Sequence, residues 1–256
     1  MKKIYITVAL LWLSVSSTIH AGEIKKLALL SVMGDSMSIV VSQPTVGSHI
    51  DQNHVQVLPL PDPILDDAAT KAAVDAVKLL SIEPPIQRVV LKWAAAQNKP
   101  AITSNKLTLS AELQSALSES HASHLLLFTK YRAASALKTR EGAIGIGTLE
   151  GIGFYIDRSV AMRDRNTNES QTGFLSPFAY FLMSLIDLSS GEVVNEQTVR
   201  ASYTFLNDQL THGQDPWEAL SVEKKVSVMQ QLIRSETMRL MPKLLGAPYR
   251  EGVIVK

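Results

Sequence analysis

The tripeptide Gly34-Asp35-Ser36 is the first feature of the chain that could do chemistry. It interrupts an apolar run, LALLSVMGDSMSIVV, at residues 27–41. A serine hydroxyl becomes an effective nucleophile when a neighbouring base takes its proton, and histidine is the usual base. His212 is the candidate base in this chain. One hypothesis is therefore that Ser36 and His212 form the catalytic pair of a hydrolase.

The tripeptide resembles the nucleophile motif of the SGNH or GDSL esterases, which place a Gly-Asp-Ser at the end of a first strand. That family takes its base from an Asp-x-x-His motif near the carboxyl end and binds the oxyanion with Gly and Asn donors. Here Asp208 and His212 have the spacing Asp-x-x-x-His, and the run after Ser36 is β-branched, where the family has a loop and a helix. The resemblance implies a serine esterase that uses Ser36 with His212.

A hairpin turn is the competing interpretation of the same residues. Gly followed by Asp is permitted in a two-residue turn of the II′ type, and the segments on either side are rich in strand-forming residues. This interpretation predicts that residues 27–33 and 36–41 pair as antiparallel strands. We favour it over the esterase, so we expect a noncatalytic protein with no catalytic residues.

A series of glycines is the second feature that could bind a ligand. These glycines are Gly142, Gly145, Gly147, Gly151 and Gly153. A phosphate-binding Gly-x-Gly-x-x-Gly motif needs a third glycine and a following helix start, but Glu150 stands at that position and no helix start follows. We therefore predict no cofactor and interpret the glycines as points where a sheet edge or bulge bends.

Two histidines, His121 and His124, have a spacing that could place them on one helical face. A zinc site needs at least a third protein ligand, and no carboxylate or imidazole nearby supplies it. We predict no metal and interpret both as ordinary surface histidines.

The first residues have the order of a secretory signal peptide. Lys2 and Lys3 precede an apolar run at residues 4–13, and a small, polar stretch ends at Ala21. The apolar run is shorter than the roughly 20 residues that span a bilayer, which favours a cleaved signal over a membrane anchor. We predict that residues 1–21 are removed and that the protein is periplasmic or secreted in a Gram-negative bacterium.

Cysteine content and charge restrict the partners of the exported chain. The chain has no cysteine, so it lacks the residue to which bacterial lipoproteins attach their lipid anchor. The formal charge of +1 becomes −1 once Lys2 and Lys3 are removed. Nonspecific nucleic-acid binding needs a basic field, which this balance does not supply. We expect an envelope protein or a second copy as partner, with no nucleic acid and no stable membrane span.

Periodicity and turn residues predict one α/β domain over residues 22–256, with a mixed sheet flanked by helices. The predicted helices begin at Asp66 or Asp67, at Ser110 and, as a closing amphipathic helix, at Asp215. Residues 86–96 are either a strand followed by a helical turn or one short helix, and we favour the helix. The predicted strands after the first two are a proline-containing edge piece at 55–61, then 124–131, 154–157, 178–188 and 193–205, the last two forming a hairpin. The Gly- and Asn-rich composition around 133–176 predicts a flexible insertion.

The aromatic side chains near the start of the predicted hairpin are dense for a loop-to-strand transition. They include Phe174, Phe178 and Tyr180. Core packing is the first interpretation, and a partner surface is the alternative if part of the group is exposed.

The order of elements resembles the envelope α/β domain shared by three kinds of protein. These are the curli secretion channel subunit, the lipoprotein activators of penicillin-binding proteins and the amino-terminal domain of the Tol-Pal translocation protein. The segment LIDLSSGEVV at 185–194 is similar to the "Leu-Val-Asp-x-x-Thr-Gly-Glu-Ile" hairpin of that family. The resemblance implies a noncatalytic domain that binds proteins or assembles and uses no cofactor.

Overall fold

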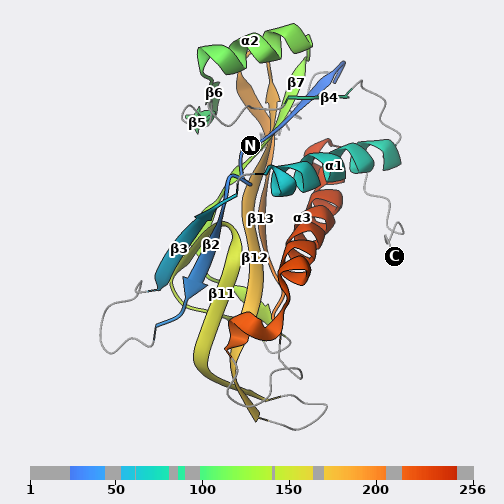
Figure 1. Ribbon diagram of the computed structural model, residues 1–256. Helices are drawn as coiled ribbons and strands as arrows, with labels where there is room; N and C mark the ends of the chain where they lie inside the picture. The colour runs from blue at the N-terminus through green and yellow to red at the C-terminus, as the bar shows by residue number, and fades with distance from the viewer. Residues whose placement is uncertain are drawn as a thin grey trace, which may run out of the picture.

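Strand β12 (Ser170–Asp187) is the central strand of an 11-stranded mixed sheet. One of its edges pairs antiparallel with β13 (Glu192–Ser202). Its other edge has two partners in succession: β11 (Thr148–Arg163) pairs with β12 as far as Tyr180, and β7 (His124–Lys130) pairs with it from Phe181 onward. The sheet therefore divides into two lobes, a β7 lobe and a β11 lobe, on one side of β12 (Figure 1).

The two lobes are extended by consecutive segments near the amino terminus. In the β7 lobe, β1 (Leu27–Ser31) lies parallel between β7 and β4 (Ile86–Arg88). In the β11 lobe, β2 (Ser36–Val41) lies parallel to β11 and antiparallel to β3 (His54–Pro59), which is the outer edge. The chain thus passes from one lobe to the other between β1 and β2.

The predicted hairpin between residues 27–33 and 36–41 is therefore wrong. β1 and β2 do not pair with each other, because each finds a longer-range partner in β7 or β11. Gly34 and Asp35 form a joint between the lobes where the prediction has a turn. The physical reason is burial: residues 27–30 of β1 are at most 1% exposed, as expected for a strand covered on both faces by helices.

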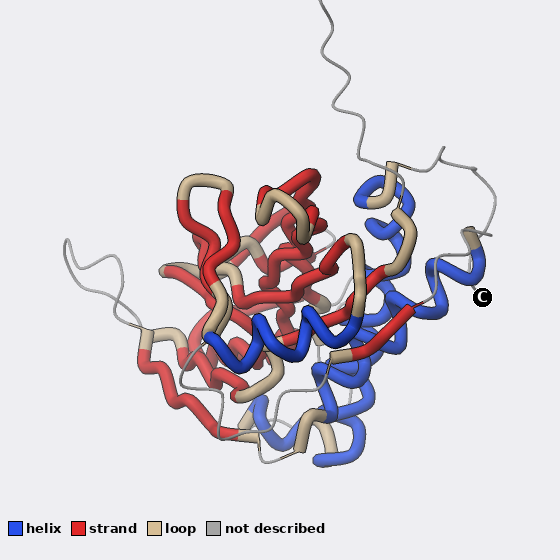
Figure 2. The backbone as a smooth tube through the Cα atoms, turned by 90° about the horizontal axis from the view of Figure 1, so that it is seen from above, coloured by secondary structure: helices blue, strands red, loops and turns tan. Residues whose placement is uncertain are grey.

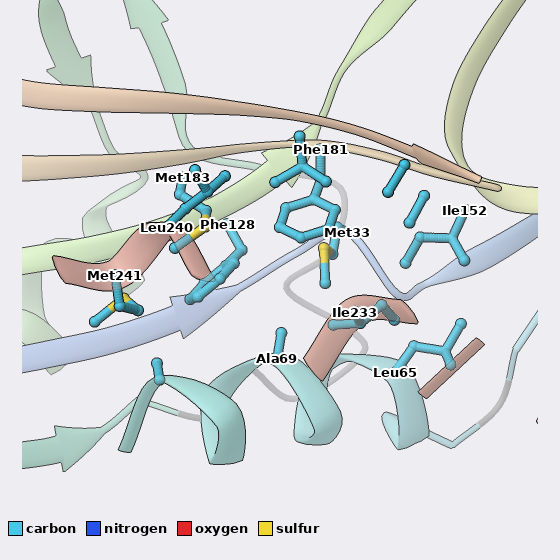
Figure 3. Packing of buried hydrophobic residues seen from close by; sticks show 14 of the residues in the cluster. Met33, Leu65, Ala69, Phe128, Ile152, Phe181, Met183, Ile233, Leu240 and Met241 are labelled. Atoms are coloured by element: carbon cyan, nitrogen blue, oxygen red, sulfur yellow. The ribbon is translucent and has the colours of Figure 1, made fainter. Parts of the chain in front are cut away.

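Among the residues that the structure describes, three α-helices cover the β7 lobe and its surroundings. Helix α1 (Ile64–Leu79) and helix α3 (Val222–Leu244) pack against one face, where alternate residues such as Leu29 and Phe128 form the main core (Figure 3). Helix α2 (Ala111–Ser120) packs against the opposite face, over Leu30 and Leu127. The view of the backbone from above shows the helices in front of the strands and on one side of them (Figure 2). The architecture is the predicted mixed α/β sheet flanked by helices, with a hairpin before a carboxyl-terminal helix.

The structure describes residues 24–43, 53–60, 62–80, 86–89, 99–139, 142–163, 170–205 and 215–246. The predicted signal peptide at 1–21 lies outside these ranges. The favoured helix from Ile86 is wrong for its first residues, which form β4, the strand that was the alternative prediction there. The carboxyl-terminal region has a short 3-10 helix, η2 (Pro216–Ala219), capped by Asp215, before Ser221 caps α3.

The stretch predicted as an insertion, around 133–176, contributes much of the sheet. β8 (Arg132–Ala134) pairs with β11, while β9 (Leu137–Thr139) and β10 (Gly142–Ile144) form a separate two-stranded sheet. β11 and the first part of β12 lie in this stretch as well. Its glycines are typical of loops, but Gly153 serves a different purpose: a Cβ there would lie 2.0 Å from the Ser38 carbonyl oxygen.

The remaining strands complete the far side of the sheet. β6 (Lys106–Thr108) pairs with β13 at one position, and β5 (Ala101–Thr103) is the edge beyond it. Among the described residues, no helix is long and apolar enough to cross a membrane.

Candidate functional site

The Gly34-Asp35-Ser36 segment lies at the joint between the two lobes, beside the end of β7. Lys130, the last residue of β7, places its Nζ 2.6 Å from Asp35 Oδ1 and 2.6 Å from Ser36 Oγ. Lys99 Nζ lies 2.5 Å from Asp35 Oδ2. Two ammonium groups therefore converge on one carboxylate, and one of them also donates a hydrogen bond to the serine hydroxyl.

The charges in this cluster neutralise one another in part. Partial burial acts to raise the pKa of Asp35, but the hydrogen bonds and positive charges of Lys130 and Lys99 outweigh it and hold the pKa below the usual value for aspartate. Asp35 is therefore ionised at neutral pH. Lys130 Nζ donates hydrogen bonds to both Asp35 and Ser36, so in this arrangement it is a donor toward the serine hydroxyl and not an acceptor of its proton.

These contacts favour a structural role for Ser36 over a nucleophilic one. Ser36 Oγ accepts a hydrogen bond from Lys130 and donates one, at 3.3 Å, to Asp35 Oδ1, whose lowered pKa makes that carboxylate a poorer base. Within the described ranges, no histidine hydrogen-bonds to Ser36. The predicted alternative base, His212, lies outside the described residues, and so does Asp208.

The same segment is clamped to the first turn of helix α1 by Asp66. One oxygen of the Asp66 carboxylate accepts hydrogen bonds from the backbone N–H of Met33, at 3.2 Å, and of Gly34, at 3.0 Å, and from the Ser31 hydroxyl. A Cβ on Gly34 would lie 2.8 Å from the Asp66 backbone nitrogen, so this close approach requires glycine. Asp66 thereby satisfies backbone donors that belong to neither lobe of the sheet.

The role of Asp66 differs from its predicted role as a helix cap. Pro63 occupies the N-cap position of α1 and makes no side-chain capping bond. Asp66 lies inside the first helical turn, where a carboxylate also interacts favourably with the helix dipole. Its bonds to Met33 and Gly34 join residues more than 30 positions apart in the chain, and no local motif marks them.

The alternative prediction of a partner surface at Phe174, Phe178 and Tyr180 is wrong, because these side chains are buried. All three are at most 1% exposed and belong to a third core on the β11 lobe, together with Tyr155. The Tyr180 hydroxyl accepts a hydrogen bond from the Ala136 backbone N–H at 3.0 Å, and burial raises the pKa of this phenol. Core packing, the first interpretation of these aromatic residues, is therefore confirmed.

The two histidines differ in their surroundings. His121 ends helix α2 with a left-handed backbone and is exposed, as predicted. His124 is only 3% exposed, so the prediction of a surface side chain is wrong for it. Its Nδ1 lies 3.0 Å from Ser123 Oγ, and its buried Nε2 has no hydrogen-bond partner. In the described part of the chain, no group of three or more potential ligands could hold a metal ion.

His124 predicts a specific pH dependence of stability. Burial lowers the pKa of His124 below its usual 6.5, and the Asp187 charge opposes this only in part. Because the folded-state pKa is below the unfolded one, protonation favours unfolding, and the stability that depends on a neutral His124 is lost as the pH falls below about 6.5. A His124→Leu variant should lose less stability than the wild type over this acidic range, measured by urea unfolding at several pH values.

The control for this experiment is His121→Asn, because asparagine tolerates the left-handed backbone of His121. This variant should keep the pH profile of the wild type. Parallel profiles for the wild type and His124→Leu would contradict the assignment.

The outer edge of the β11 lobe carries exposed apolar side chains. β3, with its proline, is the predicted edge piece, and its position at the end of the sheet confirms that prediction. Val55 is 49% exposed and Val57 is 59% exposed. They lie opposite Val40 and Ser38 of β2, so they continue the face of the sheet that holds the third core. This edge is a candidate interaction surface.

The fold and the cluster define the chain as a mixed α/β domain with an ion-paired joint at its Gly-Asp-Ser segment. No protein-family model matches the chain, and no curated protein matches it significantly.

Two solved structures are similar to the chain at low identity. One is a Xanthomonas campestris protein of the DUF330 family, with 12% identity, a TM-score of 0.39, and coverage of 84% of this chain and 81% of that one. The other is a Helicobacter pylori protein described as a neuraminyllactose-binding hemagglutinin homolog, with 7% identity, a TM-score of 0.41, and coverage of 88% and 87%. Neither is one of the envelope domains that the sequence resembles, and a likeness of this degree carries no argument about function.

Proposed function

We propose that this chain is a noncatalytic binding or assembly module that acts at the cell envelope after export. The observation that carries the proposal is the contact of Ser36 with Lys130, which is ion-paired with Asp35. A serine that accepts a hydrogen bond from an ion-paired ammonium is held in place as part of the joint. This contact supports a structural role for the one segment whose residue types suggest catalysis.

Two further features support a binding role. The exposed valines of β3 form an apolar edge, and sheet edges are a recurrent site for the addition of a strand from a partner. The resemblance of the hairpin at 185–194 to the envelope domains supports the same class of function. Export rests on the order of residues in 1–21 and is part of the proposal.

A fluorophosphonate probe tests the proposal, because such probes attach covalently to activated serines. The purified chain, incubated with the probe and analysed by intact mass, should show no adduct. The control is the Ser36→Ala variant, which should likewise show no adduct. An adduct on the wild type that is absent from Ser36→Ala would overturn the noncatalytic proposal and restore the esterase hypothesis with Ser36 and His212.

A further inference from the structure

The hydrogen bonds between β2 and β3 determine which backbone groups of β3 are free. The Leu60 N–H donates to the Asp35 carbonyl at 3.0 Å, in register with the antiparallel pairing of β2 and β3. Hydrogen-bonded and non-hydrogen-bonded positions alternate along such a pair. Leu58 and Gln56 therefore bond to β2, whereas Val55 and Val57 direct their N–H and C=O groups to the open edge.

This open edge lacks the protection that sheet edges usually carry. Free edges are commonly guarded by charged side chains, and β3 contains no Lys, Arg, Asp or Glu. Pro59 has no N–H and so limits the free donors of the strand to its first part. Val55 and Val57 thus combine free backbone groups with half-exposed apolar side chains on one face.

We propose that the partner of this edge is a second copy of the chain, with β3 paired antiparallel to β3 about a twofold axis at Gln56. In this register Val55 lies opposite Val57 of the partner subunit, and Val57 lies opposite the partner's Val55. Both are hydrogen-bonded pairs, in which the two residues exchange N–H···O bonds. The same arrangement places valine against valine across the interface between the two β3 strands, which buries the exposed surface of these side chains.

A second copy fits this edge better than a charged partner because the edge is complementary to itself. The strand carries no Lys, Arg, Asp or Glu that would select an acidic or basic peptide. A twofold axis gives the free backbone groups and the side chains of Val55 and Val57 a partner in both copies at once. Two strands of six residues make a small interface, so the dimer is reversible and depends on concentration. This inference rests on the proposed binding or assembly function and names its partner.

Cysteine crosslinking tests the register directly, because the chain has no cysteine of its own. At the twofold axis the two Gln56 side chains form a non-hydrogen-bonded pair, whose Cα separation suits a disulfide. Gln56→Cys should therefore form a disulfide-linked dimer roughly tenfold faster, or more, than a control cysteine. The control is Ala101→Cys, at an exposed position on β5, the opposite edge of the sheet.

A charge on the edge tests the association itself. Val57→Lys leaves the bonds between β3 and β2 intact, because the Val57 N–H faces away from β2, but it places two lysines on one face of the dimer. In sedimentation velocity the wild type should shift from monomer to dimer as concentration rises, and Val57→Lys should remain a monomer with unchanged circular dichroism.

Two results would overturn the dimer: a wild type that is monomeric at every concentration, or equal crosslinking of Gln56→Cys and Ala101→Cys. Neither result would contradict the proposal that the chain is noncatalytic. Labelling of Ser36 by the fluorophosphonate probe would overturn the noncatalytic proposal and would leave the dimer untouched.

Discussion

Replacing Gly153 with alanine is expected to lower the free energy of unfolding by about 3 kcal/mol, the upper end of the usual cost of overpacking a core. Gly153 lies where β11 is paired with both Ser38 of β2 and Phe178 of β12. An added Cβ would lie 2.0 Å from the Ser38 carbonyl oxygen and 2.8 Å from Phe178 Cζ. The first contact is with backbone, so β2 would have to move away from β11. Urea unfolding, followed by circular dichroism, measures the loss.

The control for this variant is Gly191→Asn in the turn between β12 and β13. Gly191 has a φ of 70° and nothing within 4 Å of an added Cβ. Asparagine tolerates this left-handed backbone, so the loss should stay below about 1 kcal/mol. Equal losses for the two variants would show that Gly153 is not required by the close approach of β2.

Replacing Asp66 with alanine is expected to lower the free energy of unfolding by about 2 to 3 kcal/mol, because it leaves partly buried donors without an acceptor. The donors are the backbone N–H groups of Met33 and Gly34 and the hydroxyl of Ser31. All three belong to the joint between β1 and β2, so the loss should be accompanied by faster amide hydrogen exchange there. Denaturant unfolding and hydrogen exchange together check both effects.

The matched control is Asp66→Asn, because the amide keeps an oxygen that can accept from the same two N–H groups. It should recover more than half of the stability lost in Asp66→Ala. A result in which asparagine is as damaging as alanine would indicate that the negative charge in the first turn of α1, and not the hydrogen bonds to the joint, is what matters.

Elements with a strong local pattern were predictable from the sequence. The continuous apolar run at the start of β7 predicts a strand buried on both faces, and residues 125–128 are fully buried. The turn residues before Glu192 predict the hairpin of β12 and β13, and their register confirms it. Ser110 was predicted to start a helix, and its side chain accepts a bond from the Leu113 N–H. In each case the determining residues are neighbours in the chain.

The pairing of strands was not predictable because its determinants are distant in sequence. β1 aligns Leu27 with His124, and β2 aligns Ser38 with Gly153. A local turn signal at Gly34-Asp35 predicts that β1 and β2 pair with each other. They pair instead with the buried strands β7 and β11, because these pairings bury more apolar surface than a hairpin would. The glycines of β11 contribute to the prediction of an insertion in a stretch that forms part of the sheet. Glycine is common both in loops and where two backbones approach closely, so its presence does not distinguish them.

The candidate site shows the same limit. The Gly-Asp-Ser tripeptide was identified from its residue types, but its partners Lys99, Lys130 and Asp66 lie far along the chain. Only the fold brings two ammonium groups to Asp35, and these contacts change the interpretation of Ser36. A serine with an adjacent acid suggests catalysis in a sequence, whereas the ion pairs around Ser36 are the basis for the structural role that we propose for it.

Hydrolysis of short-chain aryl esters by the whole chain is the most direct test of that structural role. The assay includes His212, so it examines the esterase hypothesis with every candidate residue present. We predict that the wild type and Ser36→Ala hydrolyse the ester at the same rate, equal to that of buffer alone. A wild-type rate above that of buffer that is lost in Ser36→Ala would contradict the account and make Ser36 a nucleophile.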